Sequence, residues 1–100
     1  HRGSIGYVDV RALTPALASQ LEAPNTNGVV VWRIHQASSA AQAGIEPGDI
    51  IISFDGQPIE DPSDYTRQLS DAEIGSTAIL EIFRMGQLVE FKVLVSQARQ

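Results

Sequence analysis

The 100-residue sequence contains no cysteine and only seven lysines and arginines, against twelve aspartates and glutamates. Without cysteine it can form no disulfide and no thiolate site. The net charge of −5 is opposite to the basic excess of proteins that bind nucleic acid or anionic membranes. The apolar runs, such as 29–32 and 50–52, are far shorter than the ~18 residues that a membrane span needs. These absences argue against nucleic acid as a partner and against direct membrane insertion.

The residue groups that catalysis and metal binding need are also missing. The two histidines are His1 and His35, and no Gly-x-Ser-x-Gly sequence surrounds a nucleophile. A zinc site needs three or four clustered ligands, which two histidines without cysteine do not supply. No phosphate-binding loop or dinucleotide motif occurs. We therefore expect that the domain itself is not an enzyme, hydrolyses nothing, and has no metal and no cofactor.

The composition is that of one small folded domain. The apolar fraction is 43% and the charged fraction 19%, which distinguishes the chain from a disordered segment. One hundred residues can bury a single core. We expect one domain over residues 1–100, with its core at about 2–96 and a polar tail or linker at 97–100. Because the first residue is histidine and not methionine, we expect a piece of a longer protein.

The most informative stretch is 38–59, which combines several turn signals with one apolar strand. Ser38 or Ser39 can cap a short helical turn, and Gly44 can end it because glycine adopts a left-handed conformation at least cost. The Pro47-Gly48-Asp49 sequence favours a tight turn. The apolar run 50–54 is too short for a helix and indicates a buried strand, followed by an Asp-Gly hairpin turn.

The rest of the chain contains further strand and helix patterns. Strand patterns are rich in β-branched and aromatic residues, and helix patterns begin with a capping residue followed by proline. The expected strands are about 7–10, 29–34, 77–84 and 88–95, and the expected helices are 14–21 and 61–70. The run 29–34 is almost entirely apolar, which indicates burial on both faces or a place in the middle of a sheet.

The order of turns in 38–59 resembles the central segment of PDZ domains, particularly those of bacterial HtrA/Deg-type serine proteases. The opening stretch Arg2-Gly3-Ser4-Ile5-Gly6-Tyr7 is similar to the stretch that opens those domains, and the resemblance extends to Val95. It implies a mainly β fold with two short helices. The expected form is a PDZ-like, partly open β-barrel or sandwich of five to six strands, in the permuted arrangement of the bacterial proteases.

The same resemblance implies a peptide-binding site. An extended peptide would add to the strand at 7–10 and lie against the helix at 62–69, while backbone amides of 5–7 hold its terminal carboxylate. Ile5 and Tyr7 are expected to point together into the pocket for the last residue, and Tyr65 toward the core. The expected peptide- or carboxylate-binding residues are Arg2, Ser4, Ile5, Gly6, Tyr7, Val8, Asp9, Val10, Pro62, Thr66 and Leu69.

The implied parent is a trypsin-like serine endopeptidase of the periplasm or another extracytoplasmic space. The domain would recognise peptides or unfolded protein C-termini for an attached serine protease domain, and an oligomeric parent is left open. Two other roles remain open. One is a docking module of another membrane-associated protease or secretion component, and the other is an assembly module that binds internal segments. A free-standing hydrolase is the weakest alternative, for lack of a catalytic group.

Overall fold

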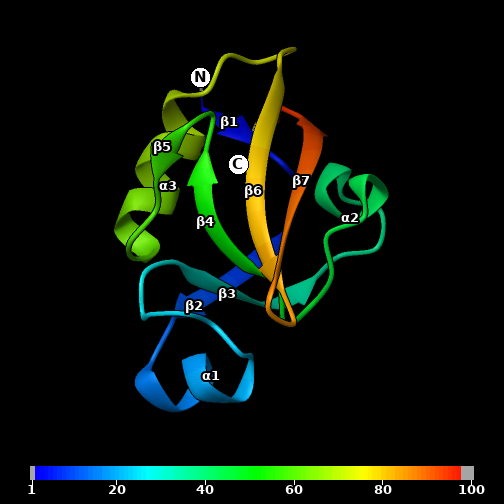
Figure 1. Cartoon of the computed structure of the whole chain (residues 1–100). Helices are drawn as coiled ribbons and strands as arrows, with labels where there is room; N and C mark the ends of the chain where they lie inside the picture. The colour runs from blue at the N-terminus through cyan, green and yellow to red at the C-terminus, as the bar shows by residue number, and fades with distance from the viewer. Residues whose placement is uncertain (1, 98–100) are drawn as a thin grey trace.

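The computed structural model describes residues 2–97, which form an antiparallel sheet with helices around it (Figure 1). The strands are β1 (Gly3–Ser4), β2 (Val8–Ala12), β3 (Val29–Ile34), β4 (Ile50–Phe54), β5 (Gln57–Pro58), β6 (Thr77–Arg84), β7 (Gln87–Leu94) and β8 (Ser96–Gln97). The helices are α1 (Pro15–Gln20), α2 (Ser39–Ala43) and α3 (Pro62–Asp71). The expected mainly β fold is confirmed. The helical turn expected after Ser38 forms α2, so the described residues contain three helices.

The main sheet has the strand order β2-β3-β4-β6-β7, and β5 pairs with β4. Every pairing in it is antiparallel. A separate two-stranded sheet joins β1 to β8, near the two ends of the described chain. The main sheet does not close into a barrel, because β2 and β7 lie at its two ends without pairing to each other. The partly open arrangement agrees with the fold expected from the resemblance.

Each helix begins at a side chain that accepts a backbone hydrogen bond. Thr14 Oγ1 accepts from the Leu17 amide at 3.2 Å, and Ser38 Oγ accepts from the Ala41 amide at 3.0 Å. Asp61 Oδ1 accepts from the Asp64 amide at 2.8 Å. Such caps satisfy amides that the first helical turn leaves unpaired. Among residues 2–97, no helix has the length and apolar character required to cross a membrane.

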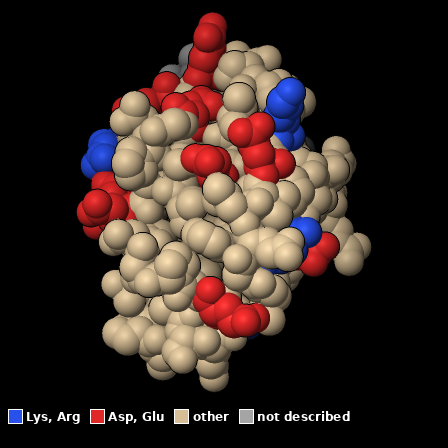
Figure 2. Space-filling model, viewed as in Figure 1, with Lys and Arg blue, Asp and Glu red and all other residues tan. Residues whose placement is uncertain are grey.

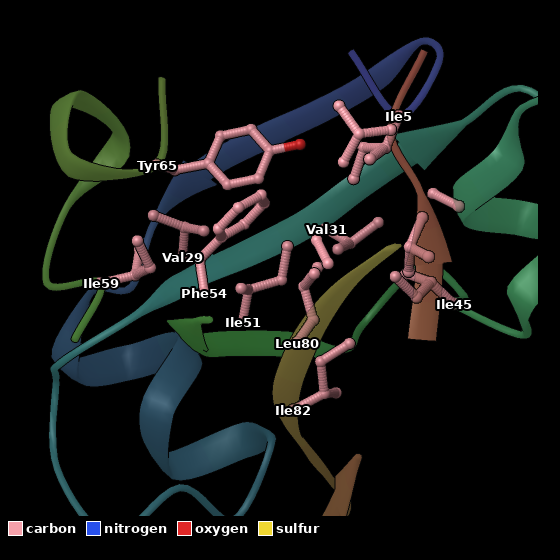
Figure 3. Packing of buried hydrophobic residues seen from close by; sticks show 14 residues of the cluster. Ile5, Val29, Val31, Ile45, Ile51, Phe54, Ile59, Tyr65, Leu80 and Ile82 are labelled. Carbon is pink, nitrogen blue, oxygen red and sulfur yellow. The ribbon is translucent and has the colours of Figure 1, made fainter. Parts of the chain in front are cut away.

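The main core lies between the sheet and α3. Figure 3 shows Val31, Ile51, Phe54 and Leu80 packed beneath Tyr65 of α3, as expected for Tyr65. A second cluster lies under α1 and includes Val30. Val29 and Val31 belong to the main core while Val30 faces the second cluster. The run 29–31 is therefore apolar throughout because both faces of β3 are covered.

A buried ion pair ties the turn before β4 to the end of β6. The Asp49 side chain is 2% exposed, and Arg84 donates to it from Nε at 2.8 Å and from Nη2 at 2.7 Å. Arg84 Nη2 also donates to the Gly44 carbonyl at 2.7 Å. Hydrogen bonding to Asp49 raises the pKa of the Arg84 guanidinium. Because Arg84 is one-third exposed and Asp49 is buried, removing Arg84 would leave the Asp49 carboxylate buried without its cation, so the pair fixes this turn.

Candidate functional site

The edge of β2 that faces away from β3 is available for another strand. On its other side β2 pairs with β3, from Val8 opposite Ile34 to Ala12 opposite Val29, with an irregularity after Asp9. No described strand pairs with the remaining edge, since β2 ends the sheet. Helix α3 packs against both β1 and β2. We call this arrangement the β2–α3 site: the unpaired edge of Val8–Ala12 together with helix Pro62–Asp71.

The loop of residues 4–7 leads into β2 and is held by contacts with the segment 35–40. Gly6 has φ +89°, and a Cβ added there would lie 2.2 Å from the Ser38 Cβ. The Ala40 amide donates to the Ile5 carbonyl at 3.1 Å, and the His35 amide donates to the Tyr7 carbonyl at 3.0 Å. Only glycine fits a position with this φ and this contact. The loop is therefore pressed against the start of α2.

The amides of the same loop are less engaged than its carbonyls. The Gly6 amide donates to Ser4 Oγ at 3.0 Å. Within residues 2–97, the amides of Ile5 and Tyr7 donate to no other described group. Neighbouring amides around a glycine of positive φ can converge on one anion. The loop therefore leaves two amides at the start of β2 that can donate to an anion.

The structure brings most of the expected site residues to these two elements and the loop before them. Val8, Val10 and Leu69 are half-buried and pack on the main core, so they offer apolar surface beside the edge. Thr66 is exposed on α3. The other expected residues are exposed at Arg2, Gly6 and Tyr7, and half-buried at Ser4, Asp9 and Pro62.

Ile5 departs from the expectation. Its side chain is 0% exposed in the main core, whereas Tyr7 is 60% exposed. The expectation that both side chains share one pocket assumed an extended strand, in which residues two apart face the same way. The positive φ of Gly6 breaks that alternation between them. Ile5 can therefore contribute only its backbone to a site at the loop, and Figure 3 shows its side chain within the core.

Both elements of the β2–α3 site carry charged side chains. Asp64, in the first turn of α3, accepts from the Glu60 amide at 3.1 Å and from Arg67 Nη2 at 3.0 Å. The Glu60 hydrogen bond and then Arg67 hold the pKa of Asp64 below its ordinary value. On β2, Arg11 pairs with Asp9 at 3.4 Å and lies 5.1 Å from the Trp32 ring centroid. The face shown in Figure 2 carries more acidic than basic side chains.

An open recess of about 670 Å³ is lined by the loop 4–7, the segment 35–39 and β8. Sequence reasoning missed it, because Ser38 and Ser39 were interpreted only as caps of a helical turn. The segments that line it are far apart in the chain, so no local pattern marks it. Its lining residues are Ser4, Gly6, Tyr7, His35, Ala37, Ser38, Ser39, Ser96 and Gln97.

The described residues show no group suited to a metal. Among residues 2–97, no three His, Asp or Glu side chains gather closely enough to hold an ion. Among the described residues that line the recess, the ionisable side chains are His35 and Tyr7. What the loop and the β2 edge offer is hydrogen bonding to an extended chain and to an anion.

Comparison with known proteins gives consistent matches over the whole chain. A family model described as PDZ domain matches residues 8–95. A probable periplasmic serine endoprotease DegP-like of Rhizobium meliloti (strain 1021) is 31% identical over 103 residues, covering 99% of this chain and 20% of that protein. The periplasmic serine endoprotease DegP of Escherichia coli (strain K12) is 31% identical over 99 residues, covering 99% and 21%. The chain thus spans about a fifth of the length of these relatives.

Solved structures with the same fold include two that contain peptides. The HtrA-type protease AlgW with a decapeptide has a TM-score of 0.87 and 33% identity, and the match covers 99% of this chain and 30% of that one. The HtrA3 PDZ domain bound to a phage-derived ligand (FGRWV) has a TM-score of 0.79 and 25% identity, covering 95% and 86%.

Proposed function

The chain belongs to the PDZ domain family, and from this membership we propose that it binds peptides by strand addition at the β2–α3 site. The observation that carries the proposal is the unpaired β2 edge that begins at a loop with two unengaged amides. Main-chain hydrogen bonds along such an edge give affinity, and neighbouring side chains give specificity. The peptide-containing neighbours in the same fold support this assignment.

In the proposed complex each part of the site has a separate role. The backbone amides of Ile5 and Tyr7, on either side of Gly6, hold the terminal carboxylate, and the edge at Val8–Val10 pairs with the peptide main chain. From α3, Pro62, Thr66 and Leu69 form the opposite wall. Ser4 acts through its hydrogen bond to the Gly6 amide, and Arg2 adds a positive charge near the loop.

We further propose that the chain is the substrate-recognition or regulatory domain of a periplasmic serine endopeptidase of the HtrA type. The names of the relatives support both the attached protease domain and the compartment. The partners would then be peptides or unfolded protein C-termini. A second candidate is a docking or assembly module, in which the same edge binds an internal segment of another protein.

Titration calorimetry with one peptide in two forms tests the carboxylate site. A peptide with apolar last residues and a free C-terminus should bind with a Kd of roughly 1–100 μM, because a short peptide must order and buries little surface. Amidation should weaken binding by about tenfold, since it removes the charge that the loop amides hold. Equal affinities of the two forms would remove the carboxylate site from the proposal and favour internal segments.

A matched pair of variants tests the place of binding. Thr66→Trp puts a large side chain on the exposed wall of α3, and Thr26→Trp makes the same change in the loop between α1 and β3. The first should weaken the free-acid peptide at least about tenfold and the second should leave it unchanged. Equal effects of the two would place the peptide elsewhere.

A further inference from the structure

The recess, which the loop 4–7 lines in part, shares residues with the proposed carboxylate site. Its walls come from the loop 4–7, the segment 35–39 and β8, and none comes from β2 or α3. Ser4, Gly6 and Tyr7 belong to both places, so the recess begins where the β2–α3 site ends. Its volume of about 670 Å³ lies within the ~300–1,000 Å³ range of ligand pockets.

The hydroxyl groups in the wall of the recess are held in place and leave acceptor capacity. Ser39 Oγ donates to the Leu94 carbonyl at 2.8 Å, whereas Ser38 Oγ donates to the His35 carbonyl at 2.6 Å and already accepts from the Ala41 amide at 3.0 Å. Ser96 Oγ donates to the Ser4 carbonyl at 3.2 Å. A hydroxyl that donates its one proton still has oxygen lone pairs that can accept. The Ser39 and Ser96 hydroxyl oxygens therefore offer fixed acceptors in the lining of the recess.

Donors are also present in the lining of the recess. His35 Nδ1 accepts from the Ala37 amide at 3.2 Å, which places the proton of the neutral ring on Nε2. The Ser4 hydroxyl accepts from Gly6 and donates to no described group. No Asp, Glu, Lys or Arg is among the described residues that line the recess. This combination of donors and acceptors without fixed charge matches a peptide main chain or a hydroxyl or amide side chain.

We propose that the recess is a second subsite, which receives the residues that follow the anchored position when the bound segment does not end at the loop. The inference rests on the proposed function. The subsite selects uncharged, hydrogen-bonding residues such as serine, asparagine and glycine. Because Ser4 Oγ already satisfies the Gly6 amide, the loop does not depend on a carboxylate for that amide. A main-chain carbonyl of the bound segment can then accept from the amides of Ile5 and Tyr7.

Two further observations bear on the path of the bound segment and on the charge it can carry. Gly6 is wedged against Ser38, so the loop cannot move toward α2 and the segment must pass over it into the recess. The net charge of −5 repels acidic residues placed there. An acidic extension should therefore bind less well than a neutral polar one.

Three synthetic peptides test the subsite by calorimetry on the 100-residue chain. The first ends in a free carboxylate, the second is the same peptide amidated, and the third continues for three residues, Gly-Ser-Asn, before its amide. The third should bind about threefold to tenfold more tightly than the second, the effect of about one net hydrogen bond. Equal affinities of the second and third peptides would overturn the inference, even if the free acid binds well.

Filling the recess gives an independent readout. Ala37→Trp changes an exposed side chain in the wall without removing the backbone amide that bonds His35, and Ala37→Leu is a smaller version of it. Ala16→Trp makes the same change on an exposed position of α1. Both Ala37 variants should abolish the gain from extension and leave free-acid affinity within about twofold, while Ala16→Trp keeps the gain. A loss that is equal for the free acid and the extended peptide would overturn the inference, and failure of all three peptides to bind would overturn the proposed function.

Discussion

Tyr65 is the residue whose burial and hydrogen bonding are least matched. Its ring packs in the main core, and its hydroxyl is buried without a hydrogen-bond partner among the described residues. Burial raises the pKa of the Tyr65 hydroxyl above its ordinary value, so it stays neutral. Figure 3 shows the hydroxyl directed toward Ile5, an apolar neighbour. A buried polar group without a partner lowers stability.

Removing that hydroxyl should stabilise the protein. Tyr65→Phe keeps the ring and deletes the unsatisfied group, so the free energy of unfolding in urea should rise by ~1 kcal/mol. Tyr7→Phe is the matched control, because Tyr7 is exposed and its hydroxyl should contribute less than ~0.5 kcal/mol. A clear loss of stability in Tyr65→Phe would show that the hydroxyl has a partner in solution.

The residues around Gly6 include side-chain directions that the sequence could not predict. The core position of Tyr65 could be predicted from its place on the helix at 61–70. The direction of Ile5 could not, because one glycine of positive φ reverses the alternation that a strand would impose. The hydrogen bond of Ser96 to Ser4 joins residues 92 apart in the sequence, and no local pattern contains it.

At the scale of the element, the stretch from α2 to β4 follows its turn residues closely. Ser38 caps α2, and Gly44 ends it with φ +111°. These positions could be predicted because glycine, proline and serine each favour one local geometry. The Asp49–Arg84 ion pair could not, since it joins this turn to a strand 35 residues later. Asp49 was interpreted only as a turn residue, a role it also has through the Glu46 amide at 2.8 Å.

Gly44→Val should destabilise the fold without acting on the ligand directly. Valine is strongly disfavoured at positive φ, and a Cβ at this position would lie 3.0 Å from Phe91 Cε1. We expect a loss of ~1–3 kcal/mol in free energy of unfolding, as at other strained backbone positions. The comparison is Gly48→Val, which has φ +93° but no atom within 4 Å of its added Cβ. An unchanged melting temperature of Gly44→Val would contradict the backbone geometry described for the end of α2.

At the scale of the whole molecule, the two ends of the sheet differ in what lies beside them. Helix α2 packs against β7, as Figure 1 shows at the right of the sheet. Strand β7 also carries the exposed charges Glu90 and Lys92, which discourage pairing with another chain. The β2 edge instead begins at the loop 4–7, and β2 packs against α3. The account therefore predicts strand addition at one end of the sheet only.

Amide hydrogen exchange followed by NMR, with and without the free-acid peptide, tests whether a peptide adds to the β2 edge. An amide that donates to an added strand exchanges more slowly, because it must open before it exchanges. The account predicts peptide-induced shifts and slower exchange for amides within residues 5–10, while the amides of β7 (Gln87–Leu94) keep their rates. Protection that appears along β7, or a bound peptide that leaves residues 5–10 unchanged, would contradict it.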